Sequence, residues 1–201
     1  MSTTFDLQGQ HQDKAYQILS SLITPRPIAW VTTLNEDGST NAAPFSFFNC
    51  FGSRPPLVVF APGNREPGVP KDTARNIRRH RQFVIHTVDA SVMHAMNDSA
   101  APHPYGVSEV DLNKLTLTPS ETIDVPRITE APVALECSEH SCIEIGANRL
   151  VLGIVQRVHV REGLMDPTTA KLNTHAYAPI GRMASPNWYC TTDALFELIR
   201  P

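Results

Sequence analysis

The 201-residue chain has few charged residues, few cysteines and no long apolar run. Charged side chains make up 18% of it and the formal net charge is −3, so nucleic acid and anionic membranes are not expected partners. Four cysteines (Cys50, Cys137, Cys142 and Cys190) are too sparse for a disulfide framework and predict reduced thiols. Without a membrane-length apolar stretch or a secretory start, the chain is expected to be cytoplasmic.

Several common catalytic motifs are also missing. The sequence contains no G-x-G-x-x-G, H-E-x-x-H or G-x-S-x-G, which argues against a Rossmann domain, a zinc protease and a serine hydrolase. The pair Cys137 and Cys142 suggests zinc, but strand alternation places the two side chains on opposite faces. We therefore expect no metal site.

Proline and glycine, in contrast, are frequent and divide the chain into short apolar runs. Seventeen prolines and ten glycines stand at intervals typical of strands. The length suits a single domain over residues 1–201. Strands are expected at 28–34, 40–45, 57–61, 82–88, 131–145 and 149–160, and helices at 13–22, 73–80 and 91–96. A mainly antiparallel sheet of about seven strands tends to close into a barrel or sandwich, which removes exposed edges.

The first candidate binding segment is Lys71-Asp72-Thr73, at the start of a predicted helix. Asp72 or Thr73 is expected to cap the helix, and the free N–H groups of a first helical turn attract anions. Lys71 adds a full positive charge beside them. An ordinary capped surface helix explains the same three residues.

Two further segments suit a flat ring. Residues 43–50 read A-P-F-S-F-F-N-C, which places aromatic surface beside hydrogen-bonding groups, although such residues also simply fill barrels. Residues 24–33 read T-P-R-P-I-A-W-V-T-T, where two prolines stiffen the entry into a strand. A stiff backbone suits ligand binding and is equally compatible with a plain strand entry.

The order of these segments resembles the flavin reductase-like family of FMN-binding split-barrel proteins. The resemblance is carried by P-R-P-I-A-W-V-T-T, A-P-F-S-F-F-N, R-P-P-L-V-V-F, K-D-T-A-R-N-I, A-P-V-A-L-E-C and V-L-G-I-V, from about Ser20 to Ile180. It implies a mainly β fold, an antiparallel Greek-key split β-barrel that binds FMN, with a few short helices. The family includes NAD(P)H:flavin reductases, monooxygenase components and flavoredoxin-like electron carriers, so the reaction stays open.

The resemblance also implies cofactor-binding residues. One strand is expected to run along the flavin, the aromatic segment to contact its ring and ribityl chain, and the K-D-T segment to receive its phosphate. The residues so implied are Trp30, Val31, Thr32, Thr33, Ser46, Phe47, Phe48, Asn49, Cys50, Lys71, Asp72 and Thr73.

Two positions depart from the family pattern, and one loop carries a separate hypothesis. Relatives commonly have a small residue at the position of Cys50 and an asparagine at the position of His86. The surroundings of the flavin or the substrate preference are therefore expected to differ from those of relatives. For Cys50, a buried small apolar residue is favoured over a redox-active thiol. His103 and Tyr105, on a proline-stiffened loop, are hypothesised to shape the substrate or nicotinamide pocket, with a plain surface loop as the alternative.

These observations favour an FMN-dependent oxidoreductase, specifically an NAD(P)H:flavin reductase. Two alternatives remain: a flavoprotein that holds FMN tightly and acts directly on a small molecule, and a flavoredoxin-like carrier. No protein acid or base is required, because the flavin itself accepts the hydride. A homodimer is expected from the resemblance, with a monooxygenase or electron-transfer protein as a further partner.

Overall fold

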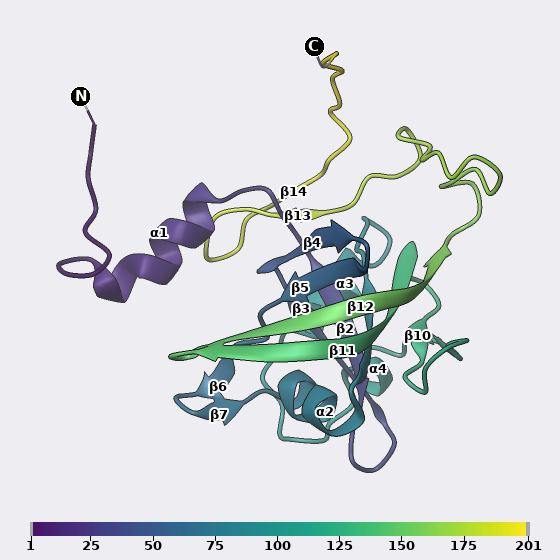
Figure 1. The fold of residues 1–201 in the computed structure, drawn as a ribbon, viewed down its shortest axis with the longest axis horizontal. Helices are drawn as coiled ribbons and strands as arrows, with labels where there is room; N and C mark the ends of the chain where they lie inside the picture. Colours follow the sequence, from purple (N-terminus) through teal and green to yellow (C-terminus); the bar gives the residue numbers. More distant parts are fainter. Residues whose placement is uncertain (1, 200–201) are drawn as a thin grey trace.

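The computed structural model of the protein describes residues 2–199, and one curved antiparallel sheet dominates it (Figure 1). Seven strands lie in the order β3-β2-β8-β11-β12-β5-β4. Their bounds are β2 Ala29–Leu34, β3 Thr40–Phe45, β4 Phe48–Ser53, β5 Pro56–Phe60, β8 Gln82–His86, β11 Val133–Ile145 and β12 Asn148–Val160. The mainly β, antiparallel prediction with few short helices is confirmed.

The sheet curls because its two edge strands are neighbours in the chain. β3 ends at Phe45 and β4 begins at Phe48, yet they stand at opposite edges of the sheet. Three residues of backbone span at most about 11 Å, so the two edges must meet at this point. Within residues 2–199 no ladder joins β3 to β4, so the barrel remains split beside the link formed by Ser46 and Phe47.

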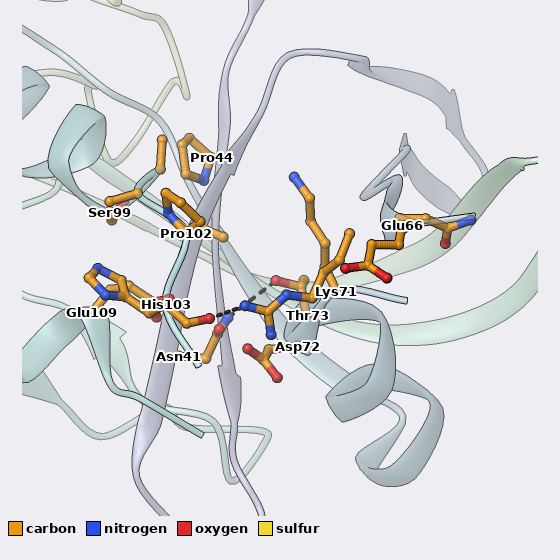
Figure 2. A pocket seen from close by; sticks show the side chains of 15 residues that line it. Asn41, Pro44, Glu66, Lys71, Asp72, Thr73, Ser99, Pro102, His103 and Glu109 are labelled. Atoms are coloured by element: carbon orange, nitrogen blue, oxygen red, sulfur yellow. Dashed lines mark hydrogen bonds between the residues drawn. The ribbon is translucent and has the colours of Figure 1, made fainter. Parts of the chain in front are cut away.

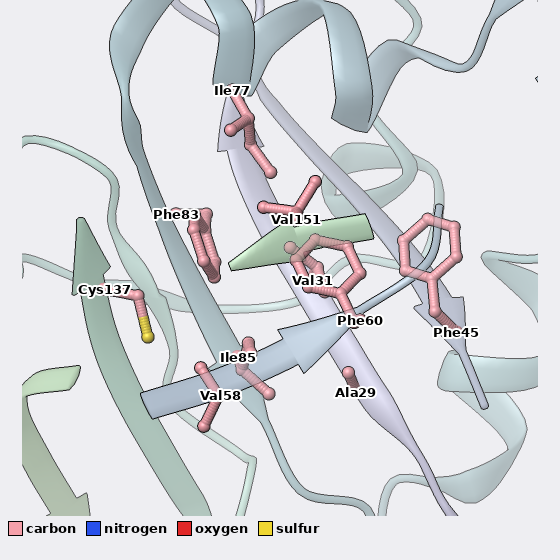
Figure 3. Close-up of a cluster of buried hydrophobic side chains, with 10 residues drawn as sticks. All are labelled: Ala29, Val31, Phe45, Val58, Phe60, Ile77, Phe83, Ile85, Cys137 and Val151. Carbon is pink, nitrogen blue, oxygen red and sulfur yellow. The ribbon is translucent and has the colours of Figure 1, made fainter. Parts of the chain in front are cut away.

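β2 is buried on both faces and therefore belongs to two cores. Val31 points into the barrel, where it packs with Phe60 and Ile85 (Figure 3). Trp30, the next residue back, points the opposite way into a second cluster with Met96, as strand alternation requires. Both side chains are fully buried. β2 thus fixes the barrel to the helices on its outer side.

The helices and smaller sheets surround this barrel. Helical segments are η1 Gln12–Lys14, α1 Ala15–Leu22, α2 Asp72–His80, α3 Met93–Asp98 and α4 Glu109–Leu112. The short strands are β1 Arg26–Pro27, β6 Asn64–Glu66, β7 Val69–Pro70, β9 Leu117–Thr118, β10 Arg127–Ile128, β13 Gly181–Arg182 and β14 Tyr189–Cys190. In the part of the chain that the structure describes, no helix is both long and apolar enough to cross a membrane.

The sequence located the long elements better than the short ones. The hairpin predicted around residues 146–148 is present as β11 and β12, with Gly146 at a positive φ of 58°. β4 was predicted only as a ligand-contacting segment, and β1, β6, β7, β9, β10, β13, β14 and α4 were not predicted. All eight elements that were not predicted are two to four residues long, too short for periodicity to appear.

His86, one of the two departures from the family pattern, is a structural residue. Its ring is fully buried, with Nδ1 2.9 Å from the Trp30 carbonyl oxygen and Nε2 accepting from the Ile128 N–H at 2.9 Å. Because Nε2 accepts, the proton must sit on Nδ1, and the ring is neutral. Burial lowers the pKa of His86 to about 4. Its two nitrogens are therefore occupied by the backbone and unavailable to a ligand.

Acid should weaken the fold through His86. The unfolded chain takes up this proton near pH 6.5 and the folded chain only near pH 4, so stability is lost as pH falls through that window. Between pH 7 and pH 5 the free energy of unfolding should drop by about 2 kcal/mol from this residue, measured by urea titration.

The His86→Gln variant should lose this component of the pH dependence, whereas His94→Gln, at an exposed histidine, should retain it. The buried Glu136 does not interfere. Burial alone would raise its pKa, but hydrogen bonds from Thr122, the Glu121 N–H and His159 lower the pKa to about 2. An identical drop in wild type and His86→Gln would contradict the assignment.

Candidate functional site

Two adjoining cavities lie beside the split in the barrel. The first, here the polar cavity, has a volume of about 580 Å³ and lies at the start of α2 (Figure 2). The second, the aromatic cavity, has a volume of about 360 Å³ and lies against the link between β3 and β4. Pro44, Lys71 and Ala100 line both, so the two form one continuous cleft.

The start of α2 opens into the polar cavity without a side-chain cap. Lys71 is the N-cap residue, with an extended backbone, and no side chain accepts a hydrogen bond from the first turn. The prediction that Asp72 or Thr73 caps the helix is therefore wrong: both lie inside the helix, and the Thr73 Oγ1 instead accepts from the Asn41 amide at 3.2 Å. The free N–H groups of this turn attract an anion.

Two cations stand beside this helix start. Lys71 and Arg65 form no ion pair with a carboxylate anywhere in residues 2–199, while most other arginines near α2 do. Lys71 is exposed, but partial burial against the cleft walls and, to a smaller extent, Arg65 lower the pKa of its ammonium group. Two cations without a carboxylate partner in the described residues, placed beside an open helix start, suit an anion.

The inner wall of the polar cavity carries the opposite charge. Glu109 is 6% exposed, and its Oε2 accepts from the Ala42 N–H at 3.0 Å. Burial raises the pKa of Glu109, with a further contribution from the nearby Asp72. Burial likewise raises the pKa of Asp72, against the lowering effect of Arg65 and Arg75. The cavity is thus cationic at Lys71 and acidic on its inner side.

The aromatic cavity offers flat surface and a positioned hydroxyl. Tyr16 and Phe47 lie with ring centroids 5.9 Å apart, and Ser46 lies between the cavity and Arg26. The Arg26 Nε donates to the Ser46 Oγ at 3.3 Å, while its guanidinium also donates to the carbonyls of Ile23 at 2.9 Å and Met183 at 3.0 Å. Arg26 thereby fixes the link that closes the barrel.

The structure gathers about half of the predicted site residues around the cleft. Those that line it are Ser46, Phe47, Lys71, Asp72, Thr73 and His103. The side chains of Trp30, Val31, Thr32 and Thr33 are fully buried, so this strand can meet a ligand only through its backbone. Phe48 packs against the barrel core, and Asn49 lies exposed on β4 outside both cavities.

Tyr105 lies just outside the cleft and connects neighbouring elements of its wall. Its ring centroid is 4.3 Å from the Arg65 guanidinium carbon and 4.1 Å from that of Arg75. Its hydroxyl donates to the Pro70 carbonyl oxygen at 2.7 Å. These contacts tie the loop that carries His103 to the β6–β7 hairpin and to α2.

The interpretation of Cys50 as a buried apolar residue is wrong. Cys50 is exposed on β4, which is an edge strand and leaves the core after Phe48. Its thiol lines neither cavity. Of the pair considered for zinc, Cys137 is buried in the barrel core and Cys142 is exposed near the end of β11.

Several residues of the cleft were missed from the sequence. These are Tyr16, Asn41, Arg65, Glu109, Arg149, Arg182 and Tyr189. They come from seven separate segments, and the local sequence around each carries no motif that marks it as a binding residue. Only the cleft itself, a product of the tertiary fold, identifies them.

The open seven-stranded barrel defines the chain as a split-barrel protein. Residues 20–181 match the flavin reductase like domain, and the chain belongs to that family. The predicted family is thus confirmed, and with it a flavin-utilising oxidoreductase.

Relatives with similar sequences cover nearly the whole chain. An uncharacterized protein of Deinococcus radiodurans is 40% identical over 98% of this chain and 89% of its own. The structure of the 2-nitrobenzoate 2-nitroreductase NbaA of Pseudomonas fluorescens is 37% identical in sequence and has a TM-score of 0.89. The match covers 99% of this chain and 96% of the nitroreductase chain. The structure of nitrilotriacetate monooxygenase component B of Bacillus cereus is 35% identical in sequence and has a TM-score of 0.92. The match covers 98% of this chain and 99% of that chain.

Arg26 should be required for the geometry of the link. In Arg26→Lys the ammonium group cannot reach the hydroxyl and the carbonyls that the guanidinium bridges, so the free energy of unfolding should fall by about 2–3 kcal/mol. Arg54→Lys, at an exposed arginine, is the matched control and should change it by less than about 0.5 kcal/mol. Equal stability of Arg26→Lys and wild type in urea titrations would refute this role.

Proposed function

We propose that the protein binds FMN in the cleft and acts as an NAD(P)H:flavin reductase. The observation that carries the proposal is the shared wall at Lys71, which joins an anion-binding helix start to a cavity lined by aromatic rings. FMN consists of a flat ring, a hydroxylated chain and a phosphate dianion. The two ends of the cleft supply complementary surfaces for the ring and the phosphate.

The residues present fit this cofactor. Lys71 and the open first turn of α2 would hold the phosphate, with the Thr73 hydroxyl beside them. Phe47 and Tyr16 would contact the ring, and Ser46, fixed by Arg26, would hydrogen-bond its edge or the ribityl chain. For the other predicted cofactor contacts, the family resemblance is the only support. These are the backbone of residues 30–33 and the side chains of Phe48, Asn49, Cys50 and Asp72.

Bound FMN would supply the redox chemistry, because its ring takes up a hydride and releases electrons to an acceptor. The chain itself binds, orients and partly shields the ring. No G-x-G-x-x-G segment exists to hold a nicotinamide dinucleotide in a separate domain, so the donor would bind within the open cleft. His103, on the wall of the polar cavity, would contact that donor or a substrate.

Two other functions are supported by particular relatives. The likeness to the nitroreductase favours tightly bound FMN acting directly on a small molecule, and the likeness to the monooxygenase component favours a partner oxygenase. A flavoredoxin-like carrier is supported by the fold alone. We further propose that the protein is cytoplasmic. We also propose a homodimer, since the end of α1, the residue after it and the C-terminal segment expose large apolar side chains: Leu22, Ile23, Phe196, Leu198 and Ile199.

Steady-state kinetics with purified protein separates these functions. A flavin reductase should oxidise NAD(P)H in proportion to added FMN and saturate with it. A dedicated flavoenzyme should be isolated yellow and respond to its own substrate without free FMN. A protein that keeps its flavin bound and oxidises NAD(P)H only slowly, with no response to added FMN or small acceptors, would contradict the reductase proposal and favour a carrier.

The phosphate assignment predicts a selective loss of affinity in Lys71→Ala. FMN should bind about 10- to 100-fold more weakly, because a charge-assisted contact to a dianion is lost. Riboflavin, which has no phosphate, should bind within about twofold of wild type.

The affinities can be measured by quenching of flavin fluorescence, with Lys171→Ala, an exposed lysine outside the cleft, as the matched control. Equal losses for FMN and riboflavin would show that Lys71 does not contact the phosphate.

A further inference from the structure

Two arginines lie side by side next to the aromatic cavity. In the three-stranded sheet β1-β13-β14, Arg26 pairs directly with Arg182, and Arg182 pairs with Tyr189 on its other side. Directly opposite residues share one face of an antiparallel sheet, where two like charges are destabilising. Burial lowers the pKa of the Arg26 guanidinium, and the charge of Arg182 lowers this pKa further. The pair is therefore unfavourable unless an anion offsets it.

No carboxylate of the described part of the chain offsets this charge. Neither arginine forms an ion pair there. Arg26 directs its donors to the Ser46 hydroxyl and to backbone carbonyls. Arg182 donates to the Pro186 carbonyl oxygen, and its guanidinium carbon lies 4.5 Å from the Tyr189 ring centroid. Neutral partners thus hold both guanidinium groups in place without neutralising them.

Arg182 is the cation of the aromatic cavity that has no assigned ligand. Lys71 lines this cavity at the start of α2, where the flavin phosphate is placed. Arg149 also lines it and forms an ion pair with Glu144 at 3.0 Å. Arg182 lines the same cavity and is half-buried. Its charge is therefore directed at the part of the cleft where the flavin ring is placed.

The described lining of the aromatic cavity contains no Asp, Glu or His side chain, the groups that most often supply a proton. Hydride transfer from NAD(P)H breaks a C–H bond of the donor and forms an N–H bond on the flavin ring, and both electrons move with the hydrogen. The ring thereby gains one negative charge, which a further proton from solvent would remove. A fixed cation offsets this charge where no carboxyl or imidazole group is present to neutralise it.

We propose that Arg182, with Arg26 beside it, is an anion-binding group whose ligand is the flavin ring in its reduced, singly negative form. The inference rests on the proposed function, because it takes the aromatic cavity as the place of the ring. In a partly enclosed cleft the attraction between two opposite charges is stronger than in bulk water. Arg182 thus favours the reduced ring over the oxidised ring and makes bound FMN a better acceptor of electrons from NAD(P)H.

Removal of this charge should weaken the binding of reduced flavin selectively. In Arg182→Gln the affinity for reduced FMN should fall about tenfold more than that for oxidised FMN, which lowers the two-electron midpoint potential of bound FMN by about 30 mV. Arg182→Met, which keeps an apolar contact with Tyr189, should give the same result. Arg182→Lys retains the charge and should keep the potential of wild type.

Spectroelectrochemical titration of FMN-loaded protein measures these potentials. The matched control is Arg54→Gln, at an exposed arginine that lines neither cavity, and it should leave the potential unchanged. Urea titration of each variant confirms that it is folded before its potential is compared with that of wild type.

The number of protons taken up gives a second readout that a purely structural role would not move. Two electrons taken up with two protons change the potential by about 59 mV per pH unit, and with one proton by about 30 mV. The pH at which the slope changes marks the loss of the second proton from the reduced ring. In Arg182→Gln and Arg182→Met this pH should lie about one unit higher than in wild type, which is the same tenfold change. Each variant leaves the other titratable or charged groups around the ring in place: Tyr16, Arg26, Lys71, Arg149 and Tyr189.

An unchanged potential and an unchanged pH of the slope change in both neutral variants, with FMN still bound, would overturn the inference and leave the proposed function standing. Binding of benzoate to FMN-loaded protein that requires Arg182, without any effect of the variants on the potential, would also overturn it, by assigning the cation to an acidic substrate. Failure of wild-type protein to bind FMN at all would instead refute the proposed function, together with the inference that rests on it.

Discussion

The two-residue link between β3 and β4 is the constraint on which the rest of the structure depends. It joins strands at opposite edges of a seven-stranded sheet, so the sheet must curl until those edges approach. The edges meet without pairing, and the aromatic cavity lies at the resulting split, with Ser46 and Phe47 in its wall. Arg26 holds this link in place through the Ser46 hydroxyl. The same short connection therefore shapes the barrel and one half of the cleft.

The other half of the cleft depends on a buried polar layer beneath α2. The Asn76 amide donates to the Thr33 Oγ1 at 3.0 Å and to the Asn35 Oδ1 at 2.9 Å, and the Asn41 amide donates to the Thr73 Oγ1 at 3.2 Å. These bonds connect the first half of the helix to β2 and β3. Since buried amides without partners are costly, the layer fixes the direction in which the helix start faces. Ile77, on the same helix, is packed into the barrel core.

Much of this could be predicted from the sequence, and the part that could not has a physical reason. The long strands, the 146–148 hairpin and the helix after Lys71 follow from periodicity and turn residues, which are local signals. The ordered motifs identified the family. Glu109, Arg65 and Asn41 could not be found in this way, because each enters the cleft only through contacts between distant segments. Cys50 and the cap of α2 were misassigned because local patterns do not reveal which strand forms an edge or where a helix begins.

A crystal structure of the protein with FMN tests the central claim most directly. The phosphate should accept hydrogen bonds from the first-turn N–H groups of α2 and from the Lys71 ammonium, with the ring against Phe47. A phosphate located away from the start of α2, or a ring outside the split between β3 and β4, would contradict it.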